Sequence, residues 1–241
     1  MKMNLTRNFV DQEFSLNKKL TLEKPSSHHL LKVLRKKEGD EIVLFDGRGN
    51  SCKGVIYKIK RSKIELEIIN LFEKSNRSGI EINLGQSLIK NDPFNLMVQK
   101  ATELGVTSLQ PLITDRSVVK IKTTKNRSLK WNLIARGACE QCGENWLPII
   151  EEPMKLDTWT STVKSKIKIV LYPNACNKIS DLEYKDSVSL AIGPEGDFTD
   201  YEVDSLTEKG FIPVTIGERI LRAETAAISA ISSIRFSAKE F

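Results

Sequence analysis

The sequence predicts an α/β protein in which a small β-rich domain precedes a larger domain built on a mainly parallel sheet. Short β-rich runs separated by tight turns fill the first third of the chain, whereas strand-like and helix-like runs alternate from about residue 80 onward. Charge divides the chain in the same place. Residues 1–75 hold 16 Lys and Arg against 10 Asp and Glu, and residues 76–241 hold 21 of each.

Composition indicates an ordinary globular protein. Of the 241 residues, 40% are hydrophobic and 28% charged, which is enough apolar surface to offset chain entropy. No apolar run approaches the roughly 18 residues that span a bilayer, and the first residues show no secretion signal, so we expect a cytoplasmic location and no membrane. The four cysteines are few and scattered, which predicts thiols in a reducing compartment.

The first domain, predicted over residues 1–72, contains one helix among its strands. SSHHLLKVLRKK begins at Ser26 or Ser27 as the N-cap and ends before Gly39. Consecutive short strands predict a small antiparallel barrel or sheet. The runs read as strands are EIVLFD, CKGVIYKI and KIELEII.

The basic excess of the first domain indicates a surface that holds a polyanion, although a solvated basic face would give the same composition. The polar stretch Glu73–Gly79 is the predicted linker, and the second domain is predicted over residues 79–241. In that domain strands alternate with helices, which predicts a parallel sheet covered on both faces. Its strands are IEINLGQSLIK, SLQPLIT, KIVLY, SVSLAIG and FIPVTIG, and its clearest helices are FNLMVQKATELG, KNRSLKWNLIARGACEQCG and RAETAAISAISSIRFSAKEF.

Three strands of the second domain end in special sequences, at Tyr172-Pro173, at Gly193-Pro194-Glu195-Gly196 and at Gly217. Ligands bind outside the carboxyl ends of strands in open α/β sheets, so these ends predict the floor of a pocket. Glycine permits a positive φ and a close approach of ligand to main chain. Each of these strand ends, taken alone, could equally be an ordinary turn that binds no ligand. Neither a dinucleotide-binding nor a nucleoside triphosphate-binding glycine motif is present.

Five segments of the chain form one ordered set: HHLLKVLRKKEGDEIVLFDGRGN, KNDPFNLMVQKATELGVTSLQPLITDRS, ARGACEQCGENWLP, LAIGPEGDF and IGERILRAETAAISAI. In this order they resemble the RsmE family of bacterial 16S rRNA (uracil-N3)-methyltransferases, and the resemblance covers nearly the full length of the chain. Each segment alone is weak evidence for the family, whereas the combination is specific.

The resemblance implies a PUA-like N-terminal barrel and a SPOUT-class domain whose C-terminal part forms a deep trefoil knot. It also implies S-adenosylmethionine as methyl donor, a homodimer, and methylation of N3 of a uridine in small-subunit rRNA. Two alternatives stay open: transfer to a ribose 2′-hydroxyl, and a non-catalytic RNA-binding factor of ribosome assembly.

The family motifs place the donor at the three strand ends. The family commonly has a second glycine after GPEG, where this chain has Asp197; we expect Asp197 to keep the loop or cap the following helix, and not to be catalytic. The residues expected to bind the donor are Leu171, Tyr172, Pro173, Gly193, Pro194, Glu195, Gly196, Ile216, Gly217, Ile220, Leu221, Arg222, Thr225 and Ala226.

Methyl transfer requires alignment and a group near the N3 proton. The polar candidates that match family motifs are Arg222, Arg116, Glu140, Glu195 and Gln141, among which the base is not chosen. A salt bridge from Arg222 to Glu218 or Glu224 is the structural alternative for Arg222.

The target base must be splayed out of its stack, and basic residues would hold the flanking phosphates. Cys139 and Cys142 have the spacing of half a zinc site, but without a second such pair we expect no metal. Candidates for RNA binding are Arg7, Arg35, Lys36, Arg48 and Lys120.

Overall fold

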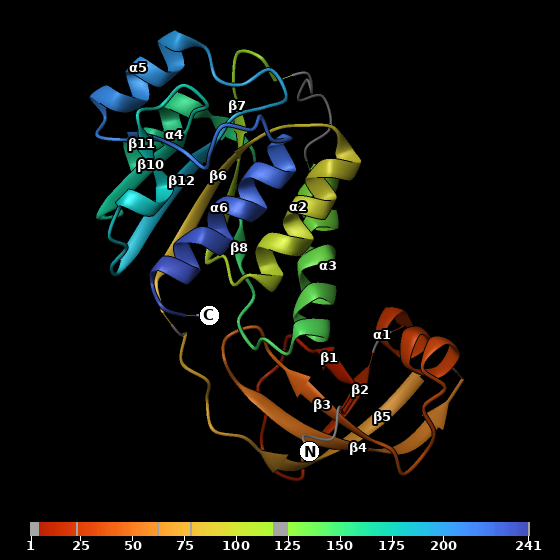
Figure 1. Cartoon of the computed structure of the whole chain (residues 1–241). Helices are drawn as coiled ribbons and strands as arrows, with labels where there is room; N and C mark the ends of the chain where they lie inside the picture. Colours follow the sequence, from red (N-terminus) through yellow and green to blue (C-terminus); the bar gives the residue numbers. More distant parts are fainter. Residues whose placement is uncertain (1–4, 23, 62, 78, 118–124, 241) are drawn as a thin grey trace. The chain divides into compact units, whose positions relative to one another are not determined.

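The chain folds into two compact units, seen in a computed structural model that describes residues 5–22, 24–61, 63–77, 79–117 and 125–240 (Figure 1). Unit 1 comprises Met1–Arg77 together with Cys139–Leu147, and unit 2 comprises Ser78–Ala138 and Pro148–Phe241. The break after residue 77 lies within the predicted linker. The sequence did not indicate that Cys139–Leu147 joins unit 1, because this segment begins inside a helix of the second half, which runs to Cys142.

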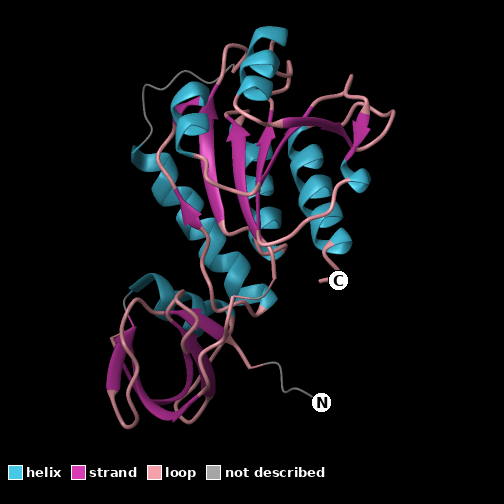
Figure 2. Cartoon of the chain, turned by 90° about the vertical axis from the view of Figure 1, so that its left-hand side faces the viewer, coloured by secondary structure: helices cyan, strands magenta, loops and turns pink. Residues whose placement is uncertain are grey.

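Unit 1 is built on one five-stranded sheet that curls around its own core (Figure 2). Its neighbours pair antiparallel, except for the first two strands of the order, which pair parallel. Alternate side chains such as Ile42, Leu44 and Leu66 are fully buried, as expected of strands with one face on a core. The order is β1 (Arg7–Phe9), β3 (Glu41–Phe45), β4 (Ser51–Lys60), β5 (Lys63–Leu71) and β2 (Lys19–Leu22), and the predicted β-rich runs correspond to β3, β4 and β5.

The helix of unit 1 differs from its prediction at both ends. α1 (Lys24–His28) continues into a single π-helical turn, η1 (His29–Val33). Ser27 lies inside α1 and is no N-cap: its hydroxyl is buried, donates to the Leu22 carbonyl over 2.8 Å and accepts from the Ile64 N–H over 3.2 Å. The helix stops well before Gly39, because Arg35 already has a positive φ of 53°.

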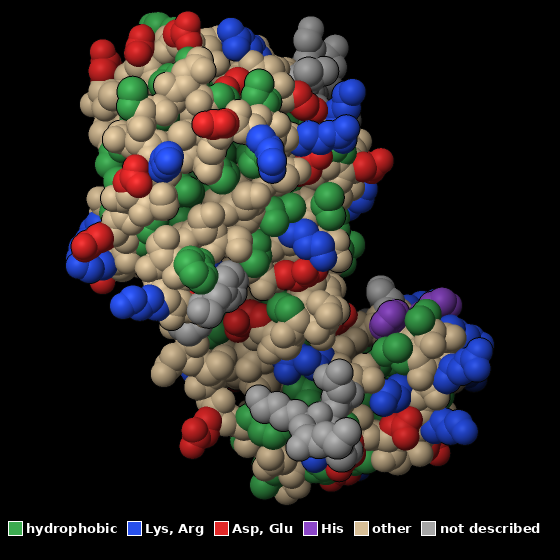
Figure 3. Space-filling view, in the orientation of Figure 1, with side chains coloured by type: hydrophobic (Ala, Val, Ile, Leu, Met, Phe, Trp, Pro, Cys, Tyr) green, Lys and Arg blue, Asp and Glu red, His purple; other side chains and the backbone are tan. Residues whose placement is uncertain are grey.

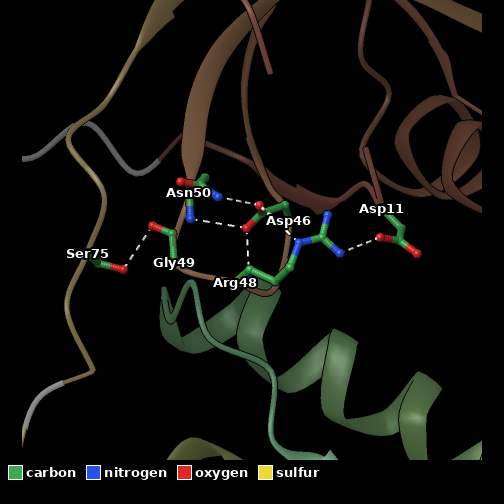
Figure 4. Close-up of polar contacts among 6 residues, drawn as sticks. All are labelled: Asp11, Asp46, Arg48, Gly49, Asn50 and Ser75. Atoms are coloured by element: carbon green, nitrogen blue, oxygen red, sulfur yellow. Dashed lines mark hydrogen bonds and ion pairs between the residues drawn. The ribbon is translucent and has the colours of Figure 1, made fainter. Parts of the chain in front are cut away.

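The turn between β3 and β4 is organised by the carboxylate of Asp46 (Figure 4). It accepts from the backbone N–H groups of Arg48 over 2.8 Å and Asn50 over 3.1 Å, and from the Asn50 amide over 2.6 Å. Burial acts to raise the pKa of Asp46, but these hydrogen bonds outweigh it and hold the pKa below its usual value. The turn is therefore fixed by a buried anion.

Cys139–Leu147 packs against this turn within unit 1. Gly49 has a φ of +92°, and a Cβ there would lie 2.6 Å from the ring of Trp146. The Trp146 indole N–H donates to the Ser75 carbonyl over 3.0 Å, while the Ser75 N–H donates to the Gly49 carbonyl over 2.9 Å. Gly49 is thus required by both its backbone conformation and the adjacent indole.

Unit 2 contains an eight-stranded sheet whose described pairs are all parallel. This confirms the predicted parallel sheet of the second half. The order is β11 (Asn177–Lys178), β13 (Ile212–Thr215), β10 (Ile167–Leu171), β12 (Ser187–Ile192), β6 (Glu81–Ser87), β7 (Ser108–Ile113) and β8 (Ile149–Ile150), with β9 (Met154–Lys155) also paired to β7.

Helices cover both faces of this sheet (Figure 2). One core joins the strands to α2 (Asn91–Glu103), α3 (Lys125–Cys142) and α6 (Ala223–Ser237). The second core lies on the opposite face and involves α4 (Leu156–Thr162) and α5 (Asp200–Glu208), while a short 3-10 turn, η2 (Ile179–Asp181), follows β11. In the part of the chain that the structure describes, no helix combines the length and apolar character that crossing a bilayer requires.

Candidate functional site

A cavity of about 530 Å³ lies in unit 2 at the carboxyl ends of β10, β12 and β13. These ends adjoin because β10 pairs with β12 on one side and with β13 on the other, in parallel. The loops that leave them therefore enclose a common space, as open α/β sheets do at their ligand sites. The volume falls in the range of sites for small molecules and cofactors.

The cavity brings together nearly all of the residues expected to bind the donor. Gly196 and Thr225 are the exceptions, since neither lines it. Several other lining residues were not expected from the sequence. Two of them, Lys90 and Pro93, have a recognisable position, because they stand where a helix starts after a strand. The lining residues are Lys90, Pro93, Leu171, Tyr172, Pro173, Ile192, Gly193, Pro194, Glu195, Asp197, Thr215, Ile216, Gly217, Arg219, Ile220, Leu221, Arg222, Ala223, Glu224 and Ala226.

The loop after β12 closes in a turn in which the Asp197 N–H donates to the Pro194 carbonyl over 2.9 Å. A Cβ at Gly193 would lie 2.9 Å from the Asp197 carboxylate and 3.0 Å from the Phe198 nitrogen, so only glycine fits. The left-handed backbone expected of a loop glycine falls instead on Asp197, whose φ is +60°. A Cβ at Gly196 would meet only the side chain of Arg116, at ordinary contact distance.

Asp197 does not cap the following helix. Thr199 is the N-cap of α5: its hydroxyl accepts from the Glu202 N–H over 3.2 Å, and the Glu202 carboxylate accepts from the Thr199 N–H over 2.8 Å. The Asp197 carboxylate accepts instead from the adjacent Phe198 N–H over 2.8 Å. Asp197 lines the cavity, and its carboxylate lies beside Gly193, 2.9 Å from the position that a Cβ would take there.

Arg116 and Glu195 hold the same loop from two sides. The Arg116 guanidinium donates to the Gly196 carbonyl over 2.8 Å and to the Phe198 carbonyl over 3.3 Å. The Glu195 carboxylate accepts from the Lys90 N–H over 3.2 Å, at the N-cap position of α2. Both catalytic candidates therefore make contacts that shape the cavity wall.

A buried amide supports the loop from below. Gln86, near the end of β6, is fully buried, and its side-chain N–H groups donate to the Gly193 carbonyl over 3.3 Å and the Ser87 carbonyl over 3.1 Å. Its side-chain oxygen has no hydrogen-bond partner among the described residues. Nothing in the sequence marks Gln86, because a polar residue in a strand is usually a solvent-facing one.

The loop after β13 carries Arg222 into the cavity wall. Arg222 occupies the N-cap position of α6 and is exposed, and its carbonyl accepts from the Ala226 N–H over 2.8 Å. Among the described residues it forms no ion pair with Glu218 or Glu224, so the salt-bridge alternative lacks structural support. At the start of the loop, the Thr215 hydroxyl bonds both the N–H and the carbonyl of Gly217.

Glu140 and Gln141 do not line this cavity. Both fall within the Cys139–Leu147 segment of unit 1, and the Glu140 carboxylate accepts from the Phe9 N–H of β1 over 2.9 Å. Glu140 therefore holds the α3 terminus to the edge of the sheet of unit 1. Its place outside the cavity lining gives no support to a catalytic role.

The RNA-binding candidates have different surroundings in unit 1. Arg7 is half-buried: its guanidinium donates to the Asn145 side chain and lies 5.0 Å from the Phe45 ring, and burial is the main cause that lowers its pKa. Arg48 pairs with Asp11 over 2.8 Å (Figure 4). Arg35 is exposed and Lys36 half-buried, while Lys120 lies outside the described residues.

Figure 3 shows Lys and Arg side chains gathered beside the two histidines of unit 1. These histidines, His28 and His29, are exposed at the junction of α1 and η1, with Lys32, Arg35 and Lys37 following on the exposed surface. Part of the basic excess of the first third thus lies on and just after η1.

The cysteines of the CEQCG run belong to unit 1. Cys139 is buried, and a hydrogen bond with Cys142 together with burial raises its pKa, so its thiol is held neutral. Among the described residues, no group of three or more His, Cys, Asp or Glu is arranged to hold a metal ion.

The family model for the RNA methyltransferase domain matches residues 76–235, and the model for the RNA methyltransferase PUA domain matches residues 22–69. A small-subunit rRNA methyltransferase E of Buchnera aphidicola from Schizaphis graminum is 34% identical over 239 residues, which cover 98% of this chain and 97% of that protein. The chain belongs to the ribosomal RNA small subunit methyltransferase E (RsmE) family.

Solved RsmE-like structures resemble the whole chain. The RsmE of Neisseria gonorrhoeae, crystallised with S-adenosylmethionine, is 31% identical to this chain, with a TM-score of 0.90. The match covers 96% of this chain and 97% of that protein. A putative Legionella pneumophila methyltransferase, in complex with the same cofactor, is 33% identical with a TM-score of 0.93 and coverage of 97% and 98%. Family membership confirms the PUA-like and SPOUT-like assignment of the two units.

Proposed function

We propose that this protein transfers the methyl group of S-adenosylmethionine to N3 of a uridine in 16S rRNA. The cavity at the ends of β10, β12 and β13 carries the proposal, because it combines bare main chain, apolar walls and charged groups in a family whose relatives bind this donor. Ligand pockets typically pair apolar walls with a few placed polar groups. The sulfonium of the donor supplies an electrophilic methyl group.

The residues present suit an adenosine carrying a charged tail. Leu171, Ile192 and Leu221 provide apolar wall, while Gly193 and Gly217 leave main-chain groups accessible. Open space surrounds Gly217, where no heavy atom lies within 4 Å of the position of a Cβ. A ligand can therefore approach the main chain there.

Arg222 is the residue we assign to the reacting base. It lines the cavity, is exposed and has no ion-pair partner among the described residues, so its guanidinium is available to substrate. A fixed cation beside the uracil ring stabilises the negative charge that develops as the N3 proton leaves. Arg116 and Glu195 act by holding the loop, as their backbone contacts indicate.

Unit 1 would hold the RNA. The surface formed by His28, His29, Lys32, Arg35 and Lys37 offers positive charge without competing ion pairs among the described residues. Such a surface binds phosphates largely without reading sequence, and its contribution falls as salt rises. The substrate is RNA of the small subunit, which also implies a cytoplasmic location.

We propose in addition that the chain acts as a homodimer and that its C-terminal region is threaded as a trefoil knot. Threading is supported by the strand order, since β13 lies beyond β10 and the chain then returns to form α6, which packs against both α2 and η2. Dimerisation is supported by exposed large apolar side chains in unit 2, namely Leu96, Leu129, Leu133, Ile220 and Phe236. Light scattering on the purified protein tests the mass directly.

The function is tested with small subunits that lack the modification, incubated with the protein and labelled donor. Mapping the labelled nucleoside separates N3-methyluridine from a 2′-O-methylated product and from no product. Calorimetry with Gly196→Arg and Gly217→Arg tests the site. Undiminished donor binding by both variants would place the donor elsewhere.

A further inference from the structure

Three carboxylates line the cavity, and they differ in what surrounds them. Glu195 is exposed and accepts from the Lys90 N–H. Glu224 lies in the first turn of α6, where the helix dipole already stabilises a negative charge. Asp197 is half-buried in a loop, accepts a hydrogen bond from the Phe198 N–H over 2.8 Å, and forms no ion pair with a described residue.

The backbone at Asp197 adopts a left-handed conformation that usually belongs to glycine. The φ of +60° is one that glycine adopts freely and that costs energy for residues with a Cβ. Burial also acts to raise the pKa of Asp197, opposed by the Phe198 N–H and by the nearby positive charge of Arg116. Of the two, burial is the one that a cation offsets: a positive charge in the cavity would stabilise the ionised Asp197 carboxylate.

We propose that Asp197 gives the cavity its preference for the methyl donor over the demethylated product. This inference rests on the proposed function. S-adenosylmethionine and S-adenosylhomocysteine share the adenosine, the ammonium and the carboxylate, and differ in charge only at sulfur, which is a cation in the donor and neutral in the product. A carboxylate in the wall of a partly desolvated cavity attracts the first and not the second.

The consequence concerns turnover. An attraction that exists only before transfer is lost when the sulfur becomes neutral, so the product leaves more readily than the donor. Arg116 does not neutralise Asp197 by direct pairing, because its guanidinium is engaged with the Gly196 and Phe198 carbonyls. The positive sulfur is then the partner that the carboxylate lacks.

The test uses Asp197→Asn, which removes the charge but keeps a side-chain oxygen for the Phe198 N–H and tolerates a positive φ. Calorimetry at pH 8 measures Kd for S-adenosylmethionine and S-adenosylhomocysteine separately. We expect the donor to bind about tenfold more weakly, whereas the product Kd changes by less than about twofold. The matched control is Asp204→Asn on the exposed face of α5, which removes the same charge outside the cavity.

A second variant, Asp197→Gly, separates charge from backbone strain. Glycine relieves the strain and lacks the carboxylate, so it should show the same loss of preference as Asp197→Asn. Equal weakening of both ligands, or no change in either, would overturn the inference and leave the proposed function standing, because the unaltered protein would still bind the donor. If the unaltered protein binds neither ligand, the proposed function itself is wrong and this inference with it.

Discussion

The guanidinium of Arg116 donates a hydrogen bond to the Gly196 carbonyl over 2.8 Å, joining the loop after β7 to the loop after β12. The same guanidinium reaches the Phe198 carbonyl over 3.3 Å. Two contacts from one planar group fix the position of the turn relative to the neighbouring strand end. The shape of the cavity wall therefore depends on a residue that is not itself part of the lining.

Arg116→Ala should weaken donor binding about three- to tenfold, because a charge-assisted bond to an exposed loop is worth roughly 1 kcal/mol. Calorimetry with S-adenosylmethionine measures the change. Arg116→Lys is the matched variant, since it keeps a positive charge and N–H donors but replaces the rigid guanidinium with a flexible ammonium, and it should recover only part of the affinity. An Ala variant with unaltered donor Kd would show that the loop holds its position without Arg116.

The buried side chain of Gln86 should contribute both to the stability of the protein and to donor binding. In Gln86→Met the side chain keeps a similar size, but the Gly193 carbonyl loses its 3.3 Å hydrogen bond in a buried setting. We expect a loss of about 1–3 kcal/mol in unfolding free energy, together with weaker donor binding. In Gln86→Glu the carboxylate would face that carbonyl, so the defect should be larger. Chemical denaturation and calorimetry measure the two effects, and a Met variant with unchanged values in both would contradict the role.

The outline of the cavity was predictable from the sequence, whereas its supports were not. Gly193 and Gly217 follow apolar strand runs, and the carboxyl ends of parallel strands meet at one edge, so local pattern suffices for the loops. The contact from Gln86 to Gly193 depends on β6 lying beside β12, a long-range pairing that periodicity does not contain. The same holds for the partner of Arg116.

The CEQCG run shows that the position of a segment along the chain does not decide which unit it packs in. It continues the helix KNRSLKWNLIARGA, which predicted a place in the second domain, yet Cys139–Leu147 packs in unit 1 through Trp146. Arg7 is a similar case: a charged residue near the N-terminus is usually solvated, but here the side chain lies over the Phe45 ring. Tertiary contacts decide both, and composition does not record them.

Gly85 should tolerate no side chain. A Cβ at this position would lie 2.4 Å from the indole of Trp159, which is buried on the sheet face covered by α4. We expect Gly85→Ala to lower the unfolding free energy by about 1–3 kcal/mol, the cost of overpacking a core. Thermal and chemical denaturation measure the change.

Gly137→Ala is the matched control for Gly85→Ala. Gly137 lies within α3 with no heavy atom within 4 Å of the position of its Cβ, so alanine meets open space there. We expect it to stabilise the protein by about 0.5–1 kcal/mol, because alanine loses less conformational freedom in a helix. Equal effects of the two substitutions would mean that the indole yields to the added methyl group.

The stability of unit 1 should fall at alkaline pH because of Cys52. Burial raises the pKa of this thiol from 9.0 to about 12. Between these values the unfolded chain loses the proton while the folded chain retains it, so the folded state binds more protons and its stability decreases as pH rises. Cys52 alone contributes at most about 1.4 kcal/mol per pH unit in this window.

Denaturation at pH 8, 9 and 10 followed by circular dichroism measures that slope. Cys52→Ala removes the ionisable group, so its stability should decline less steeply above pH 9 than that of the parent, whatever its stability at pH 8. Cys176→Ala is the matched control, because it removes an exposed cysteine in place of a buried one. Parallel slopes for Cys52→Ala and the parent would mean that the thiol of Cys52 ionises as readily in the folded protein as in the unfolded chain.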